Sequence, residues 1–222
     1  MLFRSEITGN SGFGIFAASS VMGTGAVNVD SSAGTVGSLV NPIDGVGVVG
    51  EILNASNGSN INLRLGNVSS DIVGAVAVTG GNGNLAATVV DAATVSAGSG
   101  LYIVTNGRGA VSVTTEGTGS ITGLDGEAIV ALSNAGAITL NLGAGTIRGV
   151  GNYDAIFLNS STAGNITVNA VGTTIDNGVA DGDGPGSNSG ILAVTSGTGT
   201  VNITTSNGGS IGNVAGTELD FG

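Results

Sequence analysis

The sequence predicts an all-β protein built as a single-stranded parallel β-helix, a solenoid of about seven coils with about three short strands per coil. Short apolar–polar alternations recur along the chain, and Gly, Asn, Ser and Thr separate them. The 222 residues include 43 glycines, yet 41% of the residues are hydrophobic. A flexible linker would not keep apolar columns in register. We expect right-handed coils because parallel crossovers strongly favour that hand.

The first strand of each coil is predicted to place one apolar column inward. Its members are Ile15, Val48, Val76, Leu101, Ile129, Ile156 and Ile191. The next residues along the chain form an outward column, namely Phe16, Val49, Ala77, Tyr102, Val130, Phe157 and Leu192. All seven are apolar or aromatic, whereas a solvated sheet face is normally polar.

The second strand is predicted to have its first inward residue at Val27, Ile61, Leu85, Val111, Ile138, Ile166 and Val201. The steps between these residues are 24 to 28 in the middle of the chain and 34 and 35 at its ends. The outward column beside them is polar and uncharged: Asn28, Asn62, Ala86, Ser112, Thr139, Thr167 and Asn202. This alternation is that of a strand with one buried face.

The third strand is predicted around Val36, Val68, Val95, Ile121, Ile147, Ile175 and Ile211, with the same lengthening at both ends. We therefore expect longer connections at about residues 18–26 and 176–188. Corners between strands need unusual backbone angles, and Asn-Gly pairs at 57–58, 82–83, 106–107, 177–178 and 207–208 suit positive φ.

We interpret residues 6–222 as one repeat domain and a fragment of a longer protein. Residues 1–5 are interpreted as a non-native leader, because Leu-Phe-Arg-Ser is encoded by one reading frame of a common sequencing-adaptor end. The start lacks the basic and apolar regions of a signal peptide. No apolar run is long enough for a membrane-spanning helix, so we expect no membrane insertion by this segment.

The composition excludes several function classes. The chain has no His and no Cys, which removes Ser-His-Asp and Cys-His nucleophiles and the zinc sites built on those ligands. Four basic residues against 15 acidic ones, a formal charge of −11, make nucleic acid a poor partner. Arg64, Arg108 and Arg148 are the candidates for a lyase-type base, with Arg108 and Arg148 assigned to turns. We expect no catalysis and no cofactor.

Carboxylates gather before the first strand of most coils. They are Asp44, Asp71, Asp125, Glu127, Asp154, Asp181 and Asp183. Hard oxygen ligands suit Ca²⁺, and Asp181 and Asp183 lie in the segment most like a cation loop. Solvated turn carboxylates are the alternative, because the segment lacks the final Glu of an EF-hand.

The candidate binding residues are Phe16, Val49, Tyr102, Val130, Phe157 and Leu192 of the outward apolar column. A contiguous exposed apolar stripe usually marks a partner. The occupant would be another protein, another protomer or a ligand. Two alternatives stay open: the longer connections cover the stripe, or one strand is assigned out of phase by one residue, which exchanges its faces.

Residues 154–158 (Asp-Ala-Ile-Phe-Leu), 164–169 (Gly-Asn-Ile-Thr-Val-Asn) and 173–176 (Thr-Thr-Ile-Asp) resemble the passenger regions of Gram-negative autotransporters and related adhesins. The likeness extends from about residue 9 onward, and the absence of Cys agrees with that family. It implies a right-handed parallel β-helix displayed at the bacterial cell surface or secreted.

That resemblance also implies a function and a location. The segment would be structural or adhesive, anchored in the outer membrane through a C-terminal barrel that this chain lacks. Its partners would be a host or cell-surface protein, a glycan, or a second copy. The alternatives are a carbohydrate-active β-helix enzyme, which needs two carboxyls flanking a sugar, and a Ca²⁺-stabilised repeat module.

Overall fold

A computed structural model describes residues 12–151, 153–178 and 189–212, and this part of the chain contains three parallel β-sheets and no helix. Each sheet has seven strands. The strands recur in the order first, second, third sheet along the chain, so each turn of the chain adds one strand to every sheet. The predicted β-solenoid with seven coils of three short strands is confirmed.

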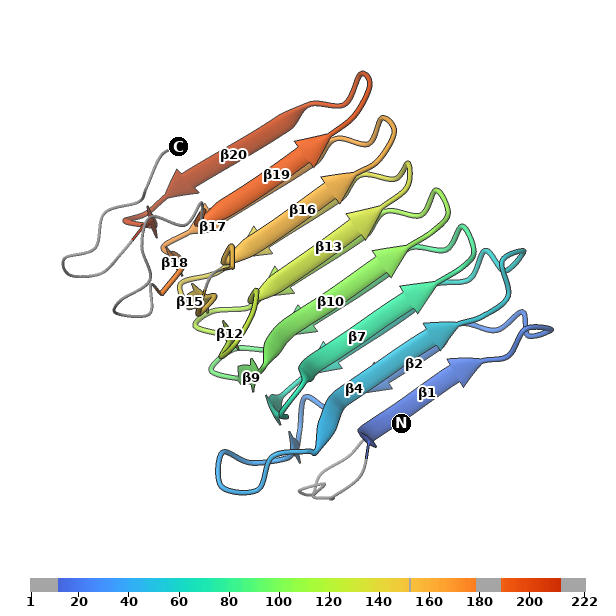
Figure 1. Ribbon diagram of the computed structural model, residues 1–222, viewed down its shortest axis with the longest axis horizontal. Coiled ribbons are helices and arrows are strands. Elements are labelled where there is room, and N and C mark those ends of the chain that lie inside the picture. The colour runs from blue at the N-terminus through green and yellow to red at the C-terminus, as the bar shows by residue number, and fades with distance from the viewer. Residues whose placement is uncertain (1–11, 152, 179–188, 213–222) are drawn as a thin grey trace.

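The first sheet has the longest strands and rises across Figure 1 as a row of parallel arrows from β1 to β19. Its strands are β1 (Gly12–Ser19), β4 (Gly45–Ile52), β7 (Val73–Thr79), β10 (Ser99–Thr105), β13 (Ile129–Ser133), β16 (Ile156–Ser160) and β19 (Ile191–Thr195).

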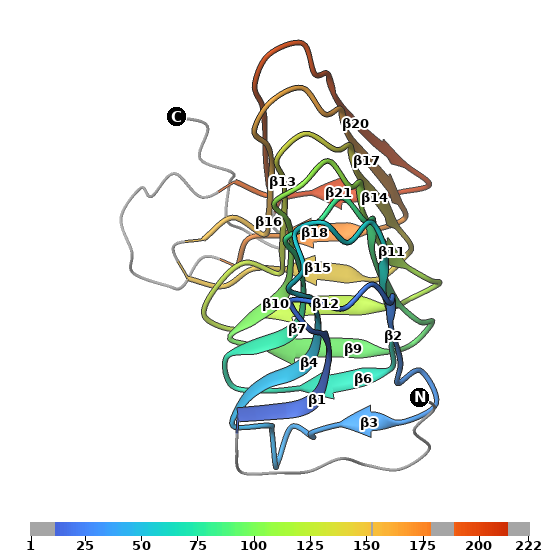
Figure 2. The same ribbon diagram turned by 90° about the vertical axis from the view of Figure 1, so that its right-hand side faces the viewer.

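The second sheet is formed by β2 (Val27–Asp30), β5 (Ile61–Leu65), β8 (Leu85–Val89), β11 (Val111–Thr115), β14 (Ile138–Leu142), β17 (Ile166–Val171) and β20 (Val201–Ser206). Figure 2 shows the short strands of the third sheet between the other two sheets. They are β3 (Thr35–Val36), β6 (Asn67–Ser69), β9 (Thr94–Ala97), β12 (Ser120–Gly123), β15 (Thr146–Arg148), β18 (Thr174–Asp176) and β21 (Ser210–Ile211).

The core is a narrow column of Val, Ile, Leu and Ala between the sheets. All seven predicted inward residues of the second strand are register partners, from Val27 to Val201. The same holds for the third strand, from Val36 to Ile211. β-Branched side chains stack well on such a pleated surface, which is why these two columns could be predicted.

In one coil the structure differs from the predicted phase of the first strand by one residue. Leu101 pairs with Ala75, and Tyr102 pairs with Val76. Val76 is therefore outward and Ala77 is inward, the reverse of the prediction. Residues 73–78 of this coil are all Val, Gly or Ala, so no polar residue marks the outer face. The apolar–polar alternation therefore cannot show which residues of this strand point inward.

A buried row of hydroxyl groups joins the first sheet to the following corner. Thr79, Thr105, Ser133 and Ser160 are register partners. Their oxygens accept backbone N–H bonds from Gly81, Gly107, Gly136 and Gly164 at 3.0, 3.2, 2.8 and 3.0 Å. The row satisfies corner amides that would otherwise be buried without a partner, which is costly.

The glycine-rich corners have two causes, and the predicted positive φ is only one of them. Of the five Asn-Gly pairs, only those at Gly178 and Gly208 place the glycine at positive φ. At Gly83 and Gly107 the φ is ordinary, but a Cβ would collide with the carbonyl oxygens of Ser59 and Gly81. Close backbone approach between coils therefore requires glycine at these two corners.

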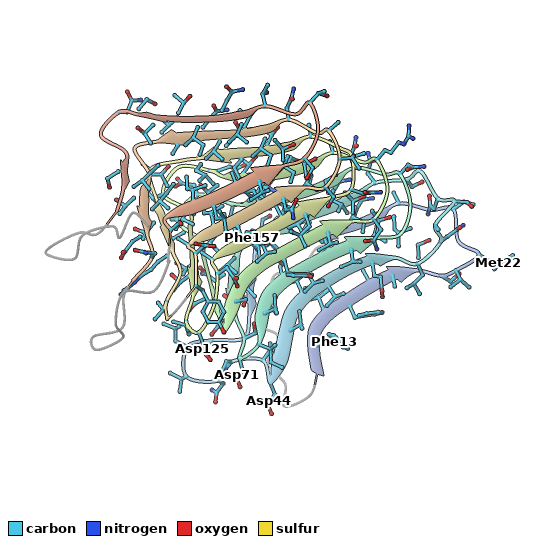
Figure 3. The ribbon with its side chains drawn as sticks, turned by 45° about the horizontal axis from the view of Figure 1, so that its top comes forward. Phe13, Met22, Asp44, Asp71, Asp125 and Phe157 are labelled. Atoms are coloured by element: carbon cyan, nitrogen blue, oxygen red, sulfur yellow. The ribbon has the colours of Figure 1, made fainter. Side chains whose placement is uncertain are left out.

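Longer connections lie in the first coils, as expected for residues 18–26. Residues 20–26 join β1 to β2, with Met22 exposed at the far corner of Figure 3. Residues 37–44, between β3 and β4, and 53–60, between β4 and β5, are longer as well. Of the predicted connection 176–188, residues 179–188 lie outside the described part, as do residues 1–5.

Candidate functional site

The outer face of the first sheet depends on a local irregularity at the start of each strand. In β1, Gly14 and Ile15 both face the core, since a Cβ on Gly14 would meet Val36 and Ile43. The same pairing of two inward residues recurs, for example as Ala128 and Ile129. An extra residue of this kind resets the alternation, so that the next residue points outward.

The outward apolar column is formed by register partners from all seven coils: Phe16, Val49, Val76, Tyr102, Val130, Phe157 and Leu192. All six predicted binding residues belong to it. Phe16, Tyr102 and Leu192 are 53%, 38% and 39% exposed. Val49 and Val130 are only 6% exposed, and each lies between two register partners, Phe16 and Val76 or Tyr102 and Phe157.

A second outward column, which sequence reasoning missed, runs beside the first. It consists of Ala18, Glu51, Val78, Val104, Leu132, Asn159 and Val194. Five of its seven members are apolar. In the sequence, each member of this column lies two residues after a member of the first column, but the column can be recognised only once the phase of the strand is known. We call the two columns together the apolar face.

At its N-terminal end the apolar face is extended by Phe13, whose ring centroid lies 5.2 Å from that of Phe16. Phe13 and its partners Val46 and Val73 also point outward at the start of their strands. The tilted ring pair presents aromatic area to solvent, which is the kind of surface that dominates interface energetics.

The second sheet presents the opposite chemistry. Its outward columns are polar, and Asn62 Nδ2 donates to Asn28 Oδ1 at 2.7 Å while Asn169 Nδ2 donates to Asn141 Oδ1 at 2.9 Å. Such amide ladders join successive coils and leave a hydrated surface. The apolar face is therefore a property of one sheet and not of the whole rod.

The carboxylates predicted before the first strand gather at one edge of the first sheet. Figure 3 shows Asp44, Asp71 and Asp125 one after another along the edge where these strands begin. Glu127 and Asp154 each lie two residues before the partners Ile129 and Ile156. Asp181 and Asp183, the Ca²⁺ candidates, lie outside the described residues. Within the described ranges no three acidic side chains are close enough to hold a metal ion together.

Two of the three arginines considered for catalysis form ion pairs. Arg64 donates from both terminal nitrogens to Glu116, at 2.8 and 3.0 Å, and this bond lowers the pKa of Glu116. Arg148 lies 3.5 Å from Asp176. Arg148 ends strand β15, so its predicted place in a turn is wrong. Arg108 lies between β10 and β11, as predicted.

Hydrogen bonds hold other carboxylates at the corner after the second sheet. Asp91 accepts from the backbone N–H of Thr118 at 2.8 Å, and this bond is the main cause of its lowered pKa. Asp30 accepts from the Ser32 hydroxyl at 2.6 Å, which likewise lowers its pKa. Both groups are engaged structurally and are poor candidates for a proton donor.

A hollow of about 330 Å³ beside β3 and β6 is lined by Thr, Ser, Asn, Gly, Val and Leu39, without any titratable side chain.

The described part of the chain contains no helix that is long and apolar enough to cross a membrane. Comparison with known proteins gives no match to a family model, a curated protein or a solved structure.

Proposed function

We propose that the chain is a structural and adhesive segment of a secreted or surface-displayed bacterial protein, built like an autotransporter passenger. The observation that carries the proposal is the apolar face, which runs through every coil of the first sheet. A contiguous patch of this kind is a common mark of an interaction surface.

The rod geometry supports display as the mechanism. Parallel strands about 4.8 Å apart repeat the same outward chemistry at fixed intervals, so that many weak contacts can be made at once. The segment would act without catalysis and without a cofactor. Two of the three arginines already neutralise carboxylates within the chain.

Adhesion of beads coated with the chain tests this function, on polystyrene and on cultured epithelial cells. Phe157→Asp places a charge in the apolar face, so we expect the number of retained beads to fall about tenfold. Thr167→Asp is the control, since it adds the same charge to an outward position of the second sheet. Equal retention for both variants, or no retention of the unmodified chain on either surface, would contradict the proposal.

A further inference from the structure

The apolar face lies beside five described carboxylates that have no partner among the described residues. Within residues 12–151, 153–178 and 189–212, no hydrogen bond or ion pair engages the side chains of Asp44, Glu51, Asp71, Asp125 and Glu127. Four of them lie at the edge where the first-sheet strands begin, and Glu51 stands on the face itself.

The other described carboxylates are partnered within the chain. Ser32, Thr118 and Arg64 bind Asp30, Asp91 and Glu116, which lie at the ends of second-sheet strands or just after them. Arg148 binds Asp176, and both residues end third-sheet strands. At the edge itself, Asp154 accepts the backbone N–H of Ser189 at 2.8 Å. The uncompensated negative charge of the described residues therefore collects on the side of the first sheet.

This edge also carries exposed apolar side chains. Ile72 and Leu124 are exposed directly beside Asp71 and Asp125, and Tyr153 is exposed beside Asp154. Acidic and exposed apolar residues are thus neighbours in three coils at this edge, where the strands of the apolar face begin. A complementary partner would need both apolar contacts and positive charge.

We propose that the apolar face binds an extended polypeptide segment that carries apolar side chains together with Lys or Arg. The inference rests on the proposed adhesive function and names the chemistry of its partner. The apolar side chains would lie on the two outward columns while the cations would reach the acidic edge. Arg108 follows β10 at the other end of the strand, so it does not neutralise this edge.

A second copy of the chain fits this surface less well. It would bring the same unpartnered carboxylates toward each other, and the formal charge of each chain is already −11. Like charges at an interface cost free energy and reduce association rates. Charge complementarity therefore favours a basic partner.

The probe is a fluorescein-labelled peptide of alternating Lys and Leu, compared with a Glu-Leu peptide of the same length. Fluorescence anisotropy measures the binding of each to the full chain. We expect binding of the Lys-Leu peptide alone, weakening between about 50 mM and about 200 mM salt as screening increases. Tyr102→Ser should weaken it by about fivefold or more through lost apolar contact.

A matched pair of double variants tests the role of the acidic edge. Asp71→Asn with Asp125→Asn removes two charges from the edge and should weaken binding by about fivefold or more. Asp30→Asn with Asp91→Asn removes two charges elsewhere and keeps the Oδ1 acceptors for Ser32 and Thr118. That control should bind within about twofold of the unmodified chain.

Three results would overturn the inference: equal binding of both peptides, equal weakening by both double variants, or a dimer in sedimentation that Tyr102→Ser dissolves. The last would assign the face to a second copy. Failure of the peptide preference alone would leave the adhesive function intact, provided that Phe157→Asp still lowers bead retention about tenfold. If Tyr102→Ser still binds the peptide and Phe157→Asp still adheres as the unmodified chain does, both proposals are contradicted.

Discussion

At the residue scale, the distance between successive coils decides which corner positions accept a side chain. Gly109, Gly136 and Gly164 follow the first-sheet strands, and a Cβ on each would collide with the carbonyl oxygen of its counterpart in the preceding coil. Their φ angles are ordinary. The sequence identified glycine as the corner residue, but the reason is a contact between distant residues that no local dipeptide reveals.

Replacing Gly136 by Ala should therefore destabilise the chain by about 1–3 kcal/mol, the usual cost of forcing extra volume into a packed site. Gly58→Ala is the matched control, since a Cβ there meets nothing within 4 Å and its φ is also ordinary. Urea unfolding followed by circular dichroism measures both. Similar unfolding midpoints for the two variants would show that the corner backbone yields without cost.

At the element scale, the sequence predicted strands wherever a bulky β-branched or leucine residue fixes the inward face. It failed in β7, where Ala75 occupies the position that holds Leu101 in the next coil. The second column of the apolar face lies two residues after the first, so it can be located only where the phase of the strand is known. Partnering of carboxylates was also beyond prediction, since Arg64 and Glu116 lie 52 residues apart.

The phase of β7 can be tested by placing a carboxylate at each of two neighbouring positions. Ala77 is fully buried, so Ala77→Glu should reduce the free energy of unfolding by about 3 kcal/mol or more, through an unpaired charge in the core. The side chain at position 76 points to solvent, so Val76→Glu should change the free energy of unfolding by less than about 1 kcal/mol. Thermal unfolding measures the stability of both variants. A larger loss of stability in Val76→Glu than in Ala77→Glu would support the phase with Val76 inward.

At the scale of the whole molecule, each coil is stabilised chiefly by its neighbours, as in other repeat proteins. Every described sheet pairing joins consecutive coils in register. The apolar face is continuous for the same reason, since parallel stacking places equivalent residues beside one another. Binding and stability thus both depend on the stacking of consecutive coils. A destabilising substitution in one coil should therefore affect mainly the adjacent coils.

Hydrogen exchange should reveal this nearest-neighbour stability as a gradient along the rod. Ile166 of β17 is fully buried, whereas its partner Val201 of β20 is 39% exposed. Among the described strands β20 pairs only with β17, so within this part of the chain its coil is stacked on one side. We expect amides of β11 and β14 to exchange about tenfold more slowly than those of β20, because local opening needs less free energy where fewer contacts break. Mass spectrometry of exchanged peptides measures the gradient, and uniform protection from β2 to β20 would instead mean that the coils open as one cooperative unit.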